Sequence, residues 1–381
     1  MQLKRSVSEV YDDTHMQFRD SICKFIAAEI SPNLKRWQAE GMVDRSFWLK
    51  CGEAGMLCPQ IPEEYGGLGL DFSYNAVVAE ELGFESFPPA VLVHSDIVAD
   101  YILEYGTEEQ KNRWLPGMVS GAAVGAIAMT EPSTGSDLQA IRTSAKKSGN
   151  GFVLNGSKTY ITNGKHADVI IVAAKTDPSA GAKGVSLFLV DASLTGVKSG
   201  NPLEKIGQHC SDTCELFFED VHVDESDLLG DEGKGFANLM NQLPQERLSI
   251  AIYAQASAQR AFMEAVTFTS ERSAFGKKVI EFQNTKFVLA DLKTELQVGW
   301  AHIDWALARH VSGNLTATEA SAAKLWHTEF QWKCCDAALQ LHGGAGYMTE
   351  YAIAGLWKDA RVTRIFGGTN EIMREIIGRS L

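Results

Sequence analysis

The sequence of 381 residues lacks any apolar run long enough to cross a membrane. Its longest run, Val169 to Ala174, has the length of a strand, whereas a spanning helix needs about 18 apolar residues or more. The N-terminal stretch, Met1 to Asp13, lacks both the apolar core of a signal peptide and the Arg- and Ser-rich pattern of a transit peptide. These absences favour a cytoplasmic protein with no membrane span.

Positive charge is also scarce. The chain has 35 Lys and Arg against 48 Asp and Glu, a formal net charge of −13, and its cations are scattered. Such a field opposes binding to nucleic acid or anionic lipid, so we expect no nucleic-acid partner.

The chain has few cysteines and no recognisable metal-binding spacing. Seven cysteines, an odd number in a long chain, do not form a disulfide framework. Cys210 with Cys214 and Cys334 with Cys335 could be redox or metal pairs, but buried reduced thiols are commoner in an intracellular protein. The nine histidines show no His-Glu-x-x-His pattern, and we predict no metal site.

Nucleotide fingerprints are missing as well. Three glycine-rich loops occur, at Gly230–Gly235, Gly343–Gly346 and Gly367–Thr369. None matches the GxGxxG pattern or the P-loop, which argues against a Rossmann-type site.

What is present divides the chain into three parts. Residues 1–122 have helical periodicity with Gly and Pro in clusters. Residues 123–235 contain short β-rich runs at 152–154, 169–174, 185–190 and 216–218, with too little room for parallel crossovers. Residues 236–381 include long stretches without Gly or Pro at 245–272, 277–298 and 314–342. We therefore predict an α+β protein: an N-terminal helical domain, a middle antiparallel β-barrel or sandwich, and a C-terminal four-helix bundle.

One carboxylate is a candidate base. In Leu243-Pro-Gln-Glu-Arg-Leu248, helical spacing places Glu246 on one face with Leu243, Ile250 and Tyr253. A carboxylate on an apolar stripe loses hydration, which raises its pKa towards neutrality. The alternative, favoured by the residues alone, is that Glu246 stabilises a helix start or pairs with an arginine. The turn Met129–Asp137 is a second candidate, for a polar ligand.

These segments resemble the acyl-CoA dehydrogenase family over nearly the whole chain, from about residue 12 to the end. The resemblance rests on motifs in the family's order: 128–137 (AMTEPSTGSD), 158–164 (KTYITNG), 217–220 (FFED), 271–277 (ERSAFGK), 340–350 (QLHGGAGYMTE), 358–361 (KDAR) and 365–372 (IFGGTNEI).

This resemblance implies FAD-dependent α,β-dehydrogenation of an acyl-CoA thioester to the trans-2-enoyl-CoA, with the fold predicted above. It also implies a homotetramer and electron-transfer flavoprotein as the electron acceptor. Many members carry the catalytic Glu immediately before a Gly-Thr pair. In this chain the residue before Gly368-Thr369 is Gly367, which cannot act as a base. A smaller set, including the long-chain and isovaleryl types, carries it on a bundle helix, and Glu246 occupies that place.

The resemblance also implies the ligand contacts. FAD would be bound by Ile127, Met129, Thr130, Gly135, Ser136, Tyr160, Ile161, Thr162, Arg272, Phe282, Gln283, Gln340, Gly343, Gly344, Thr369 and Glu371, some of them across a subunit boundary. The substrate would be bound by Ser136, Arg247, Gly367 and Gly368. Two departures from the family pattern are Ser133-Thr134, in place of Gly-Ala, and Gly355, in place of a cation.

A long-chain acyl group is favoured, because Leu92–Ile97, Gln245–Leu248 and Gly367–Met373 resemble the long-chain members. Two alternatives stay open: an acyl-CoA oxidase or flavin monooxygenase on the same fold, and a non-catalytic paralogue.

Overall fold

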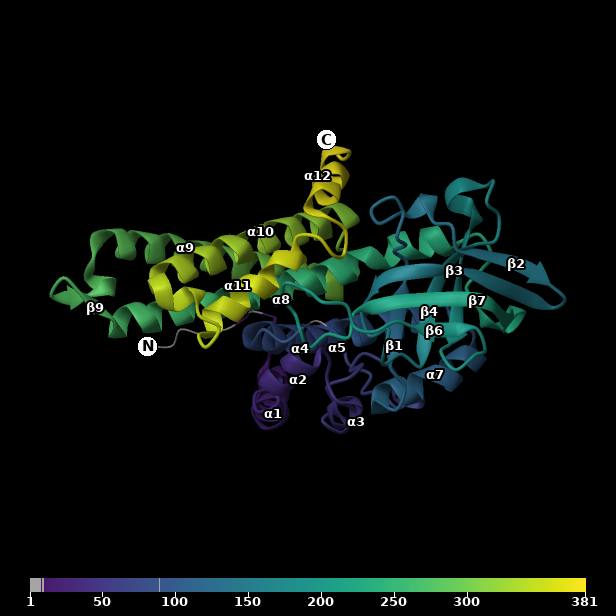
Figure 1. Ribbon diagram of the computed structural model, residues 1–381, viewed down its shortest axis with the longest axis horizontal. Helices are drawn as coiled ribbons and strands as arrows, with labels where there is room; N and C mark the ends of the chain where they lie inside the picture. Colours follow the sequence, from purple (N-terminus) through teal and green to yellow (C-terminus); the bar gives the residue numbers. More distant parts are fainter. Residues whose placement is uncertain (1–7, 9, 89) are drawn as a thin grey trace.

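A computed structural model gives the fold of the chain and describes residues 8, 10–88 and 90–381. Most of the N-terminal stretch from Met1 to Asp13, in which we expect no signal or transit peptide, lies outside the described residues. Figure 1 shows three parts in chain order: short helices, a sheet, and long helices that extend away from the sheet. Within the described residues, no helix is long and apolar enough to cross a membrane.

The N-terminal part is helical, as predicted. Its elements are α1 (Asp13–Phe25), continued by a π-helical turn (Ile26–Ile30), α2 (Leu34–Glu40), α3 (Arg45–Glu53), α4 (Phe72–Glu85), α5 (Ala90–Leu92), a second π-helical segment (Val93–Val98), α6 (Ala99–Tyr105) and α7 (Glu108–Ser120). Local sequence sets several of the ends. Thr107 and Gln110 form a capping box at the start of α7, and Gly121 ends it in a left-handed conformation.

The middle part is a single eight-stranded sheet. Its strands are β1 (Gly125–Ala128), β2 (Ser144–Ser148), β3 (Gly151–Ile161), β4 (Val169–Lys175), β5 (Val185–Asp191), β6 (Val197–Ser199), β7 (Cys214–Asp224) and β8 (Leu228–Leu229). The order is β6-β7-β3-β2-β4-β5-β8, with β1 beside β4. All four predicted β-rich runs are strands. The pairing is mainly antiparallel, but β1 runs parallel to β4, and β2 pairs with β4 in parallel at one residue pair.

The C-terminal part is a bundle of long helices. It contains α8 (Gly235–Glu271), the hairpin strands β9 (Ser273–Ala274) and β10 (Lys277–Lys278), α9 (Gln283–Val311), α10 (Ala317–His342), α11 (Ala352–Thr363) and α12 (Asn370–Gly378). Figure 1 shows α8 leaving the sheet and ending at the β9 hairpin, at the opposite end of the molecule. The helix predicted at 277–298 instead begins at residue 283, because the chain turns through the hairpin first.

Candidate active site

Glu246 lies inside the molecule, on the sheet-proximal half of α8. Glu246 is only 4% exposed, and its Oε1 accepts a hydrogen bond of 3.0 Å from the hydroxyl of Tyr101 on α6. Burial raises the pKa of Glu246 to about 7, against the opposing effects of Tyr101 and Arg247. A carboxyl group with such a pKa can accept and release a proton near neutral pH.

Arg247 provides a buried cation beside that carboxylate. Its Nη1 donates to Ser321 Oγ at 3.1 Å, while its Nε is buried without a hydrogen-bond partner among the described residues. Burial lowers the pKa of Arg247 from its usual value. An unpartnered guanidinium N–H in the interior suits a ligand acceptor, as expected for a substrate contact.

The loop at Gly367 and Gly368 lies against α8 one turn beyond Glu246. A Cβ atom on Gly367 would stand 2.3 Å from Ile250 Cδ1. Both glycines have left-handed backbones, with φ of +62° and +89°. The structure therefore brings together Glu246, Arg247, Gly367 and Gly368, the residues that the resemblance assigns to the base and the substrate contacts.

A buried lysine that the sequence analysis missed holds this loop. Lys324 on α10 donates from Nζ to the Gly368 carbonyl at 2.7 Å and to Asn370 Oδ1 at 2.8 Å. The side chain is fully buried, and this burial, with Arg247 nearby, lowers its pKa to about 7. Thr369 caps α12 through the amide of Ile372, so its hydroxyl has a structural partner, and the Glu371 side chain is exposed.

The predicted flavin contacts of the middle part also meet, where β3 passes the loop after β1. The Lys158 ammonium is buried between the Met129 carbonyl at 3.0 Å and Glu131 Oε1 at 2.9 Å. The amide of Thr159 donates to the Thr130 carbonyl at 3.0 Å. These bonds fix Met129 and Thr130 beside the end of β3.

Tyr160 has a strained and exposed position at that end. The β3–β7 ladder breaks between Lys158 and Ile161, which leaves Tyr160 in a bulge with φ of +60° and 69% exposure. A left-handed backbone at a bulky residue is costly, and such strained residues are enriched at functional sites. Ile161 next to it is buried in the sheet core, whereas Thr162 is half-buried.

The neighbouring turn is open to solvent. Gly135 and Ser136 are exposed, and a Cβ on Gly135 would meet nothing within 4 Å. Thr134, one of the departures from the family pattern, donates to the Asp137 carbonyl at 2.5 Å and stabilises the turn. An exposed tyrosine ring beside open polar backbone fits an aromatic, hydrogen-bonding cofactor such as a flavin.

One segment connects the flavin contacts to the candidate base. Asn163, just after Thr162, donates to the carbonyls of Ala90 and Gly125 at 2.9 and 3.1 Å, and the Gly125 amide donates to His94 Nδ1 at 3.1 Å. The same stretch of chain, residues 90–101, carries Tyr101. Its contacts place the middle sheet and α8 in a fixed relation.

The remaining predicted flavin contacts lie at the far end of the bundle. Arg272 and Gln283 are exposed beside the β9 hairpin, with Phe282 half-buried. His342 stacks on Phe268 at 4.3 Å between ring centres, which brings Gln340, Gly343 and Gly344 to the same end. Arg272 follows Glu246 by 26 residues, about 40 Å along a helix. The two sets are therefore separate within one chain.

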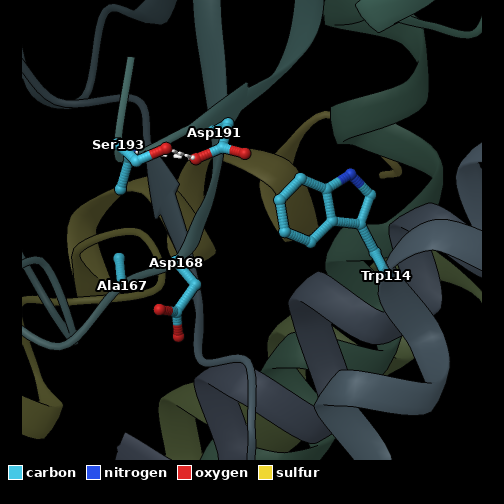
Figure 2. A pocket seen from close by; sticks show the side chains of 6 residues that line it. Trp114, Ala167, Asp168, Asp191 and Ser193 are labelled. Carbon is cyan, nitrogen blue, oxygen red and sulfur yellow. Dashed lines mark hydrogen bonds between the residues drawn. The ribbon is translucent and has the colours of Figure 1, made fainter. Parts of the chain in front are cut away.

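Two cavities elsewhere do not contribute to this site. One of about 440 Å³ is lined by Trp114, Ala167, Asp168, Asp191, Ala192 and Ser193, as Figure 2 shows, and one of about 470 Å³ shares Asp191. Neither contains a predicted site residue. Within the described part of the chain, no cluster of His, Cys, Asp or Glu is placed to hold a metal ion.

Tyr101, Lys324 and His94 are the contacts that sequence reasoning missed. Tyr101 and Glu246 are 145 positions apart, so no local periodicity connects them. The one available signal was the order of residue types in Leu92–Ile97, which resembles long-chain members and begins this segment.

Comparisons with known proteins match the whole architecture. Family models for the N-terminal, middle and C-terminal domains of acyl-CoA dehydrogenases match residues 12–122, 126–221 and 233–381. The chain is 46% identical to the mitochondrial long-chain specific acyl-CoA dehydrogenase of Sus scrofa, over 98% of this chain and 88% of the relative.

Solved structures agree. An acyl-CoA dehydrogenase from Geobacillus kaustophilus superposes with a TM-score of 0.97 at 47% identity, covering 98% of this chain and 99% of its own. A glutaryl-CoA dehydrogenase from Mycobacterium smegmatis, in complex with FADH2, gives 0.90 at 27% identity, covering 97% and 95%. The chain is therefore a member of the acyl-CoA dehydrogenase family, an FAD-dependent oxidoreductase that dehydrogenates acyl-CoA.

Proposed function

We propose that Glu246 is the base that removes the α-proton of the acyl-CoA substrate. The observation that carries this proposal is a buried carboxyl whose pKa is raised to about 7 and which lies one helical turn from the Gly367 loop. The α-carbon gives its proton to Glu246 and the β-carbon gives up a hydride, so that a double bond forms between them. Bound FAD supplies the hydride acceptor.

The Gly367 loop supports this assignment. A residue at 367 would direct its side chain at Ile250, on the turn of α8 that follows Glu246. A carboxylate at 367 would therefore lie against the same stretch of α8 as Glu246, provided that Ile250 moves aside. The resemblance suggests that Gly367 donates its backbone N–H to the thioester oxygen, where it would stabilise negative charge as the α-proton leaves.

The chain's own residues determine how the ligands would be held. The loop from Ile127 to Ser136, with Tyr160 and Thr162, would hold the flavin ring, and Thr369 and Glu371 would complete that part. Arg247 and Ser136 would contact the CoA moiety of the substrate. The other predicted flavin contacts lie at the far end of the bundle, so they would hold the adenosine part of a neighbouring chain's FAD. They are Arg272, Phe282, Gln283, Gln340, Gly343 and Gly344.

That division supports a homo-oligomer, and we propose a homotetramer built from pairs that share their cofactor sites. We also propose a long-chain acyl group, since a relative at 46% identity is named for that substrate. Electron-transfer flavoprotein as acceptor and a cytoplasmic location complete the proposal; the Sus scrofa relative is named as mitochondrial.

The first experiment tests the base. Glu246→Gln removes the proton acceptor while it keeps size and shape. We expect the variant to purify yellow and folded, with flavin reduction by substrate slowed by orders of magnitude. Near-normal reduction would overturn the assignment.

The second experiment tests the substrate. An anaerobic spectral titration with saturated acyl-CoAs of increasing chain length should bleach the flavin band, with an optimum among long chains. An optimum at short or branched chains would overturn the substrate proposal while it left the dehydrogenase intact. Rapid oxygen consumption by the reduced enzyme would instead favour the oxidase alternative.

A further inference from the structure

The segment formed by the second π-helical stretch and α6 grips α8 around Glu246. Gln245 donates from Nε2 to the Asp96 carbonyl at 2.7 Å and to Asp100 Oδ2 at 2.5 Å. Ser249 donates to Asp96 Oδ2 at 2.7 Å. The residues immediately before and three places after Glu246 are thus both tied to this segment. Between these ties the Tyr101 hydroxyl reaches the Glu246 carboxylate.

The Tyr101 hydroxyl has one close hydrogen-bond partner among the described residues, the Glu246 carboxylate. The ring is fully buried, and the oxygen lies 3.0 Å from Glu246 Oε1 and 3.5 Å from the Leu239 carbonyl. Among the described residues, Tyr101 is the only hydrogen-bond partner of the Glu246 side chain. A buried phenol usually finds a partner, but this one is aimed at the group that reacts.

We propose that Tyr101 is a positioning residue for the dehydrogenation: its hydroxyl holds Oε1 of Glu246 and leaves Oε2 to accept the α-proton. This inference rests on the proposed role of Glu246. A carboxylate that is held at one oxygen keeps one rotamer, which presents the second oxygen in a constant direction. The phenol also stabilises the ionised form, the form that acts as a base.

Among the described residues, no charged group near Glu246 forms an ion pair with its carboxylate, so Tyr101 is the group that holds and stabilises it. On the segment side, burial raises the pKa of Asp96 to about 7 and of Asp100 to about 6. From α9, His310 reaches Gln245 at 2.9 Å, and burial lowers its pKa to about 4, so it is neutral. Arg247 on α8 and Lys324 on α10 are the nearby cations, and neither forms an ion pair with Glu246 within the described residues.

The Tyr101 hydroxyl also stays protonated at neutral and moderately alkaline pH. Burial and the adjacent Glu246 raise its pKa well above 10. The hydroxyl is therefore a donor throughout the range in which Glu246 titrates.

Tyr101→Phe tests the proposal because it removes one oxygen and keeps the ring. We expect the rate of flavin reduction by substrate at neutral pH to fall by about 10- to 100-fold, the effect of losing a hydrogen bond to a charged group. The acid limb of the pH profile should move upwards by about one pH unit, because the ionised carboxylate loses its donor. Substrate affinity should stay within about threefold of wild type, since Tyr101 acts through Glu246.

Two matched variants make the result specific. Tyr105→Phe makes the same change one turn further along α6. There the hydroxyl lies 3.5 Å from the Asn238 carbonyl and hydrogen-bonds the side chains of Asn241 and Gln242, and among the described residues it does not contact Glu246. Ser249→Ala removes one of the two ties between α8 and this segment but keeps the hydrogen bond from Tyr101 to Glu246. Both should keep the acid limb within a few tenths of a pH unit of wild type.

The outcomes are distinct. An acid limb in Tyr101→Phe that coincides with wild type, or one that Tyr105→Phe or Ser249→Ala moves equally far, would overturn the positioning role. If Glu246→Gln itself reduced flavin normally, the proposed function would fail first.

A readout without turnover is the thermal unfolding of the holoenzymes in a double-mutant cycle of Tyr101→Phe with Glu246→Gln, measured above pH 8. The two substitutions should be non-additive. Additive effects would again count against the contact.

Discussion

The carboxyl of Glu246, the proposed base, lowers the stability of the folded protein at neutral and higher pH. In the unfolded chain it titrates near the usual 4.5, whereas burial raises its pKa in the folded chain to about 7. Between these values the folded protein binds more protons at this site than the unfolded chain. Stability contributed by this group is therefore largest at low pH and decreases as pH rises from about 4.5 to about 7.

Glu246→Gln should remove that dependence. At pH 8 we expect the variant to be more stable than wild type, with an upper estimate on the order of 3 kcal/mol, because the ionised group no longer has to be buried. Around pH 4.5 the two should be similar. Unfolding temperatures from pH 4.5 to 8 measure this, and parallel curves for the two proteins would contradict it.

Ile250 limits where a catalytic carboxylate can stand. Exchanging the two positions, as Glu246→Gly with Gly367→Glu, would bring the new Cβ to 2.3 Å from Ile250 Cδ1, at a left-handed backbone. Ile250→Val deletes that methyl group. We expect the exchange with Ile250→Val to be more stable and more active than the exchange alone, and to show an altered chain-length preference.

The control is Ile250→Val in the wild-type background, where a lost methyl group should destabilise by about 1 kcal/mol. Unfolding temperature and flavin reduction by a chain-length series measure both effects. An exchange that performs equally well with Ile250 intact would show that the loop relaxes away from α8.

At the scale of elements, sequence patterns predicted which segments form strands and helices, because local residue preferences decide that. They did not predict where the long helices begin and end, because contacts with distant parts of the chain decide that. The run Val169–Ala174 is apolar throughout, and it forms the fully buried strand β4. The stretch without Gly or Pro begins at residue 245, but α8 begins earlier, at Gly235, and continues through Pro244. Likewise α9 continues through Gly299, where a Cβ would meet the Gln255 side chain at 2.5 Å.

Within the candidate site, too, some residues could be predicted from the sequence and others could not. Glu246 and Gly367 could be proposed because each lies in a motif with a family counterpart. Tyr101 and Lys324 could not, since each acts on a partner that lies 145 or 44 positions away and that only the fold brings close.

The buried pair of Lys158 and Glu131 fastens β3 to the loop after β1, which we propose to hold the flavin ring. Glu131 also accepts the amides of Arg142 and Thr143 at 2.6 and 2.9 Å. We expect Lys158→Met to destabilise the protein by about 3–5 kcal/mol, because it leaves a buried carboxylate without its cation, and to release FAD.

Lys198→Met is its control within the same sheet. Lys198 pairs with Glu219 at an exposed position, so its loss should cost less than about 1 kcal/mol. Denaturant unfolding and the ratio of bound flavin to protein measure both variants. Equal losses for the two lysines would refute the anchoring role.

At the scale of the whole molecule, the separated contact sets predict complementation between defective chains. A Glu246→Gln chain keeps its β9 end, and an Arg272→Ala chain keeps its base. If sites are shared between neighbours, each mixed pair contains one intact site. Co-expressed chains, purified through two different tags, should regain activity that neither homo-oligomer has; mixed oligomers no more active than their parents would exclude shared sites.

Helix α8 has 37 residues, about 55 Å at 1.5 Å per residue, and connects the two regions. One inserted residue after Glu246 would turn everything beyond it by about 100° and advance it by 1.5 Å, so the β9 end would face a different direction. An insertion or deletion in α8 would therefore separate the two regions, whereas a substitution away from the candidate site would leave their relation intact. We expect the length of α8 to be more tightly constrained than the identity of its residues outside that site.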